Sequence, residues 1–226
     1  MINSEIFNIL PKLKICGFKK CADLQISLGL GVDFVGFNFY EGSKRFVEPE
    51  AAGEMWQKVC SQNTHQTLPV AVVVRPTEAD VARIAASFPG GIIWQFHGGE
   101  TPEIIDQLTQ NIANPVIWQA IPVGRSMESY EDLRHPACQL TLFDHGGTKP
   151  QEFGGQGQAF DWQLLQQQNL PERWGLAGGV NLENFDNALD TGAHVIDVAS
   201  GAEVSPGIKD SEIMQQMVQS VHAKRR

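Results

Sequence analysis

Residues 141–148 read TLFDHGGT, a short apolar run that ends in an acid, a histidine and two glycines. Thr141, Leu142 and Phe143 are typical of a strand that is covered on both faces. The strand runs directly into Asp144. A carboxylate at this point could cap a helix, form a surface ion pair or donate a proton in a pocket, and the ends of the other strands bear on the choice.

The same pattern, a short apolar run followed by a helical segment, recurs along the chain. The predicted strands are 12–16, 33–39, 69–74, 91–96, 115–121, 139–144, 173–178 and 194–199. The predicted helices are 21–31, 48–62, 77–88, 101–110, 126–134, 161–168, 181–192 and 211–224, and most open with Thr, Ser, Asn or Asp, as N-caps do. This alternation predicts an α/β protein, a (β/α)8 TIM barrel with a single domain over 12–226 and an N-terminal extension over 1–11. A doubly wound open sheet is the competing architecture.

Composition narrows the class of protein. A chain of 226 residues suits one barrel, and a net charge of −9 argues against nucleic acid as a partner. The four cysteines show no metal-type spacing, so we expect reduced thiols and no metal site. There is no long apolar run and no signal-like start, which predicts no membrane partner and a cytoplasmic location.

In a barrel, ligands bind where the carboxyl ends of the strands converge. The chemically able groups at these ends are Cys16, Arg45, His97, Asp144, Gly178, Gly179, Asp197, Ser200 and Gly201. Residues 145–160 form the one long connection, and five glycines there indicate a lid or binding loop.

Cys16 ends the first strand and has two readings, a buried small hydrophobe or a reactive thiolate. Lys14 on the same strand face and the following helix N-terminus would lower the pKa of this thiol. Asp144 beside a closing loop would be partly desolvated, which favours the protonated carboxyl group that a general acid needs. Together the two residues could form a base–acid pair.

Arg45 is either a solvated loop residue or a clamp for a planar carboxylate, which the guanidinium fork suits. His97 is more typical of a satisfied strand-end histidine than of a metal ligand. Gly178 and Gly179 follow the seventh strand, and Ser200 and Gly201 follow the eighth. Glycine turns in these two loops are typical of a phosphate site in a barrel.

The chain resembles the phosphoribosylanthranilate isomerase family of tryptophan biosynthesis. The matching stretches, in order over residues 12–222, are KICG (14–17), SKRFV (43–47), QFHGGE (95–100), LFD (142–144), GGQGQAFDW (154–162), LAGGVNLEN (176–184) and SGAEVSPGIKD (200–210). The resemblance implies a barrel, no cofactor and an Amadori rearrangement of a phosphorylated aminosugar. Whether the protein forms a homodimer is left open.

The resemblance also implies roles for individual residues. Cys16 matches the general base and Asp144 the general acid. Arg45 matches the arginine at the anthranilate end of the substrate, and His97 and Asp197 match pocket residues. Gly178, Gly179, Ser200 and Gly201 match the phosphate loops.

Departures from the family pattern occur at Asn38, Trp94, Phe96, Trp118, Gln119 and Ala199. They could narrow the pocket or repack the barrel, so they bear on substrate fit rather than on reaction type. Three alternatives stay open. They are an isomerase of another phosphorylated aminosugar, a non-catalytic phosphate-ligand-binding relative and, less favoured because strand-end lysines are few, an indole-glycerol-phosphate synthase.

Overall fold

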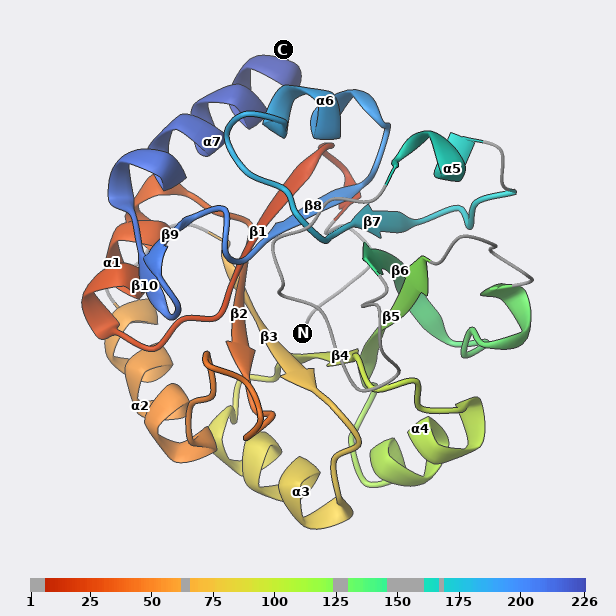
Figure 1. The fold of residues 1–226 in the computed structure, drawn as a ribbon. Helices are drawn as coiled ribbons and strands as arrows, with labels where there is room; N and C mark the ends of the chain where they lie inside the picture. The colour runs from red at the N-terminus through yellow and green to blue at the C-terminus, as the bar shows by residue number, and fades with distance from the viewer. Residues whose placement is uncertain (1–6, 62–65, 124–129, 146–160, 167–168) are drawn as a thin grey trace.

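Eight parallel strands close into a barrel in the computed structural model, which describes residues 7–61, 66–123, 130–145, 161–166 and 169–226 (Figure 1). In chain order the strands are β1 (Lys12–Cys16), β2 (Phe34–Asn38), β3 (Leu68–Val73), β4 (Ile93–Phe96), β5 (Val116–Val123), β6 (Cys138–His145), β7 (Trp174–Leu176) and β8 (Val195–Val198). Each strand pairs with the next, and β8 pairs with β1. The predicted barrel is therefore confirmed, and the open sheet is excluded because a closed ring has no edge strands.

Helices surround the strands, as Figure 1 shows. Those in the described part of the chain are α1 (Cys21–Leu30), α2 (Pro49–Cys60), α3 (Glu78–Ser87), α4 (Pro102–Thr109), α5 (Gln163–Gln166), α6 (Phe185–Asp190) and α7 (Ser211–Lys224). The helix predicted over 126–134 is wrong for its described part, which holds only a 3₁₀ turn, Tyr130–Asp132. Tyr130 packs edge-on against Phe143, while Leu133 is exposed, so this segment lacks the apolar face that a longer helix needs.

Side-chain capping sets where some helices begin. Thr77 and Asp80 form a capping box at α3, and Asp210 accepts two backbone N–H groups at the start of α7. The segment predicted as a helix from 181 turns first, because Asn181 and Asn184 bind local backbone N–H groups and α6 begins only at Phe185.

Strand alternation separates the inner from the outer face of the barrel. Alternate residues of the strands fill the lumen, with one apolar layer made of Phe34, Val70, Ile93, Trp118, Leu140 and Val195. Phe34 and Trp118 stack edge-on with ring centroids 4.8 Å apart. Phe7 packs against this layer. The outward-facing residues instead join the helices in a larger core, and each fully buried aliphatic or aromatic side chain there contributes about 1.5–3 kcal/mol.

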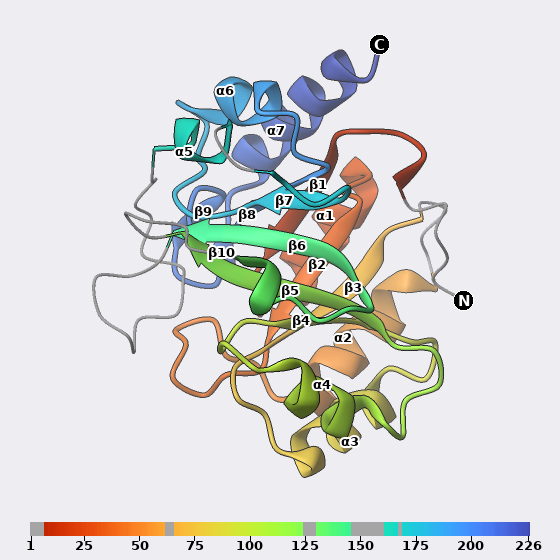
Figure 2. The ribbon, with the colours of Figure 1, turned by 90° about the vertical axis from the view of Figure 1, so that its right-hand side faces the viewer.

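A short hairpin, β9 (Glu203–Ser205) and β10 (Ile208–Lys209), follows β8. Figure 2 places it at the end of the barrel toward which the strand arrows point. This hairpin therefore adds side chains to the carboxyl end, where the candidate site residues lie. In the described part of the chain, no helix is long and apolar enough to cross a membrane.

Candidate active site at the carboxyl end of the barrel

Cys16 and its strand neighbour Lys14 share the inner face of β1, because they stand two residues apart on a strand. Lys14 is the register partner of Asp197 on β8, and the Lys14 Nζ lies 2.7 Å from the Asp197 Oδ2. All three side chains are buried. The predicted pocket residue Asp197 is thus the counter-ion of a lysine that lies directly behind Cys16.

The thiol of Cys16 differs from the prediction in one respect. Burial raises the pKa of the Cys16 thiol, and the nearby Lys14 and Lys209 ammonium groups lower it by less. Lys14 lowers the pKa of the thiol as predicted, but the pKa is raised overall because burial removes the thiol from water. Helix α1 begins only at Cys21. In the resting protein Cys16 is therefore a neutral thiol with a cation beside it.

Asp144 ends on the same lumen side, and by strand order it lies three strands away from Cys16 around the ring. Its Oδ2 lies 2.9 Å from the His97 Nε2, and its Oδ1 accepts the backbone N–H of His145 at 2.7 Å. The Gln95 amide donates to the His97 Nδ1 at 3.1 Å, so the Nε2 carries the proton that faces Asp144. The structure brings the predicted His97 and Asp144 into direct contact.

The glycine turns after β7 and β8 lie against each other and against Asp144. Gly178 has a φ of +82°, and a Cβ there would stand 2.6 Å from the Asp144 Oδ1. A Cβ on Gly201 would stand 2.0 Å from the Val180 carbonyl oxygen, and Gly201 bridges to Asn181. Close approach of the two loops thus places Gly178, Gly179, Ser200 and Gly201 in one region beside the proposed acid.

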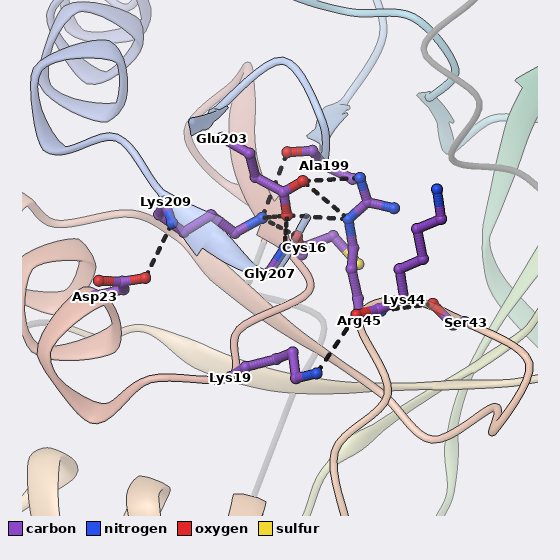
Figure 3. A network of polar contacts seen from close by, with 10 residues as sticks. All are labelled: Cys16, Lys19, Asp23, Ser43, Lys44, Arg45, Ala199, Glu203, Gly207 and Lys209. Atoms are coloured by element: carbon purple, nitrogen blue, oxygen red, sulfur yellow. Dashed lines mark hydrogen bonds and ion pairs between the residues drawn. The ribbon is translucent and has the colours of Figure 1, made fainter. Parts of the chain in front are cut away.

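Arg45 is neither a solvated loop residue nor an unpaired clamp. Its Nε and Nη2 bind the carboxylate of Glu203 at 2.8–3.1 Å, and that carboxylate also accepts Lys209 (Figure 3). Burial alone would lower the pKa of Arg45, but its bonds to Glu203 outweigh this effect. The pKa therefore lies above its ordinary value, and the guanidinium stays charged. Only the Nε–Nη2 edge is used in this pair, which leaves Nη1 outside it.

Several residues of this site were missed by sequence reasoning, namely Gln95, Glu203 and Lys209. Glu203 and Lys209 stand inside SGAEVSPGIKD, the stretch that follows Ser200 and Gly201, and an acid and a lysine so close to a predicted phosphate turn were the available signal. The predicted lid, residues 145–160, lies outside the described residues except for His145. Within the described ranges, no group of three or more His, Cys, Asp or Glu could hold a metal ion.

The departures from the family pattern are divided between the interior of the protein and the carboxyl end of the barrel, where Asn38 ends β2, Phe96 ends β4 and Ala199 directly follows β8. Trp118 belongs to the apolar lumen layer, and Trp94 and Phe96 belong to the outer core. Gln119 binds the backbone of Glu100, Leu133 and His135. Asn38 accepts the backbone N–H of Tyr40 at 3.0 Å.

A family model described as N-(5'phosphoribosyl)anthranilate (PRA) isomerase matches residues 13–220 of this chain. The chain belongs to the N-(5'-phosphoribosyl)anthranilate isomerase family. A member from Zymomonas mobilis subsp. pomaceae is 32% identical over 211 residues, which is 93% of this chain and 97% of that protein. One from Ruegeria sp. (strain TM1040) is 34% identical over 216 residues, covering 94% and 98% of the two chains.

Solved structures of phosphoribosylanthranilate isomerases share the fold. The enzyme from Thermus thermophilus superposes with a TM-score of 0.76 at 25% identity, over 94% of this chain and 98% of that one. A phosphoribosylanthranilate isomerase in complex with reduced 1-(o-carboxyphenylamino)-1-deoxyribulose 5-phosphate gives the same TM-score at 25% identity, over 95% and 100%.

Proposed function

We propose that this protein is a phosphoribosylanthranilate isomerase of tryptophan biosynthesis, which converts N-(5-phosphoribosyl)anthranilate into 1-(2-carboxyphenylamino)-1-deoxyribulose 5-phosphate. The observation that carries the proposal is the arrangement of two inward-facing groups. Cys16 and Asp144 both stand on the lumen face at the carboxyl ends of strands that lie three apart around the ring. A sugar between them would meet a sulfur on one side and a carboxyl group on the other.

The reaction needs one acid and one base. Asp144 would give a proton to the furanose ring oxygen, the ring C–O bond would break, and the glycosylamine nitrogen would form an iminium with the first carbon. Cys16 as thiolate would then remove the proton from the second carbon. The resulting enolamine tautomerises to the ketose when its first carbon is protonated. Each positioned proton transfer of this kind contributes about 10²–10⁴-fold to the rate.

Other side chains would bind and orient the substrate. The glycine turns around Gly178 and Gly201 would hold the phosphate, and Arg45 would face the anthranilate carboxylate. His97 donates toward Asp144 and would orient its carboxyl group. Holding the phosphate far from the reacting carbons positions the sugar between acid and base.

The test is consumption of the anthranilate adduct, followed by its fluorescence, with purified protein. We expect wild type to convert the adduct, and Cys16→Ala and Asp144→Asn each to lower kcat by about 10²-fold or more. Cys60→Ser, which alters a partly exposed cysteine at the end of α2, is the matched thiol control and should keep full activity. An inactive wild type contradicts the proposed function, and full activity of either site variant contradicts that residue's role.

We also propose that the protein works in the cytoplasm. The neighbour from Thermotoga maritima is described as dimeric. Sedimentation equilibrium of the purified chain distinguishes a homodimer from a monomer.

A further inference from the structure

Glu203 is the centre of a network of charges at the carboxyl end of the barrel (Figure 3). Its Oε1 accepts the Arg45 Nε at 2.9 Å, the Lys209 Nζ at 2.7 Å and the Gly207 backbone N–H at 3.1 Å. Its Oε2 accepts the Arg45 Nη2 at 2.8 Å. Lys209 in turn donates to the backbone carbonyl of Cys16. One carboxylate thus links the arginine loop, the hairpin and the end of β1.

All three charged side chains of this network are withdrawn from water. The exposed fraction is 3% for Glu203, 11% for Arg45 and 0% for Lys209. Burial alone would raise the pKa of Glu203, but Arg45 and Lys209 outweigh it, so the pKa lies below its ordinary value and the carboxylate stays charged. A buried ion network of this kind is a weak source of stability, because desolvation offsets the attraction. Because this network lies at the carboxyl end of the barrel, we infer that it holds a side chain of the site in a fixed position.

The arginine is held along its whole length. A Cβ on Gly17 would stand 2.4 Å from the Arg45 Cδ, so the aliphatic stem lies directly on the backbone after Cys16. Glu203 then fixes the far end of the side chain through two atoms of the fork, which sets the rotation of the guanidinium plane. The remaining Nη1 is left with a defined direction.

We propose that Glu203 is a positioning residue that aims the guanidinium of Arg45 at the carboxylate of the substrate's aromatic ring. Lys209 anchors Glu203 to the end of β1, so the distance between the carboxylate clamp and the Cys16 base is set by this network. The inference rests on the proposed function and deepens it. It assigns recognition of the substrate carboxylate to a residue that does not touch the substrate.

The experiment compares two substrates in four proteins. The substrates are N-(5-phosphoribosyl)anthranilate and the corresponding aniline adduct, which lacks the carboxylate. The proteins are wild type, Glu203→Gln, Glu203→Asp and the matched control Glu50→Gln. Glu50 also binds an arginine through two bonds, to Arg83, but on the exposed surface of α2 and α3.

Gln at position 203 places an N–H group against the donors of Arg45 or Lys209, which frees the guanidinium to rotate. We expect KM for the anthranilate adduct to rise by about tenfold or more in Glu203→Gln, with a much smaller change for the aniline adduct. The rise should be smaller in Glu203→Asp, which keeps the charge. The Glu50→Gln control should match wild type with both substrates.

Three outcomes separate the possibilities. An unchanged ratio of the two KM values in folded Glu203→Gln, or an equal loss of both activities, overturns the positioning role. If Glu203→Gln does not fold, as judged by circular dichroism, the KM ratio of Glu203→Asp decides in the same way. If wild type converts neither adduct, the proposed function itself is wrong and the positioning role falls with it.

Discussion

The Nζ of Lys14 lies 2.7 Å from the Oδ2 of Asp197 in the lumen of the barrel, where the first strand meets the last. Lys14 has no exposed surface. Burial by itself lowers the pKa of Lys14, but the Asp197 carboxylate raises it to above its ordinary value, so the pair is ionised. A buried charge whose partner is removed is costly, and this relationship therefore has a measurable consequence.

Replacement of Lys14 by Met should lower the free energy of unfolding by about 3–5 kcal/mol, because it leaves Asp197 buried without its counter-ion. The double variant Lys14→Met/Asp197→Asn should recover a large part of this loss. Urea denaturation at pH 7 measures both. Lys12→Met is the control on the same strand and should cost about 1 kcal/mol or less, since Asp33 keeps its bond to Arg225. Additive losses in the double variant would contradict the pairing.

Stability should decline at alkaline pH. The pKa of the Cys16 thiol is raised in the folded protein by burial, while the unfolded chain ionises its thiols near about 8.5. The folded state therefore holds the proton longer. The resulting stabilisation is complete below about pH 8.5 and is lost as the pH rises toward the folded pKa. Urea unfolding at pH 7, 8.5 and 10 should show the decline, and Cys16→Ala should show a shallower one.

The same raised pKa sets the pH dependence of activity if Cys16 is the base. We expect kcat/KM to increase from pH 7 to pH 9, because the thiolate fraction grows, for as long as the protein stays folded. A kcat/KM that is flat over this range would show that the rate does not depend on ionisation of the thiol.

His97 should influence kcat through the carboxyl group of Asp144. Replacement by Leu removes the Nε2 donor that lies 2.9 Å from the Asp144 Oδ2, and we expect kcat to fall by about tenfold. Gln at this position can present an amide N–H to the same oxygen and should retain more activity than Leu. Steady-state kinetics at pH 7.5 compares the two. Equal activity in both variants would mean that the hydrogen bond is not what matters.

The two proposed phosphate loops pack so closely at Gly201 that no side chain larger than hydrogen fits there. Ala at this position would force the Val180 carbonyl away from its present place, and we expect a loss of about 1–3 kcal/mol together with a higher KM. Gly29 in α1 is exposed with open space around it, so Gly29→Ala should stabilise the protein by about 0.5–1 kcal/mol. Thermal unfolding distinguishes the opposite signs. A neutral Gly201→Ala would contradict the close packing of the loops.

Strand positions could be predicted well because continuous apolar runs bounded by glycine and polar residues leave few alternatives. The helices were less predictable. In the described part of the predicted helix 126–134, Leu133 is exposed and only a 3₁₀ turn, Tyr130–Asp132, forms. The Asn181–Asn184 turn competes with the helix through side chains that bind backbone N–H groups. Periodicity records burial but does not reveal this local competition.

From sequence alone, the two-residue period of the strands already placed Lys14 on the same face as Cys16. The alternation of elements determined that the strands are parallel and that their carboxyl ends meet on one side of the sheet, whether the sheet is open or closed. Only the tertiary structure decided which charges pair, since Lys14 meets Asp197 across 183 residues and Arg45 meets Glu203 across 158. Pairing of β1 with β8 brings Lys14 to Asp197, and the β9–β10 hairpin brings Glu203 to Arg45. The direction in which the pKa of the Cys16 thiol shifts was likewise decided by packing, because desolvation depends on every element that excludes water from the site.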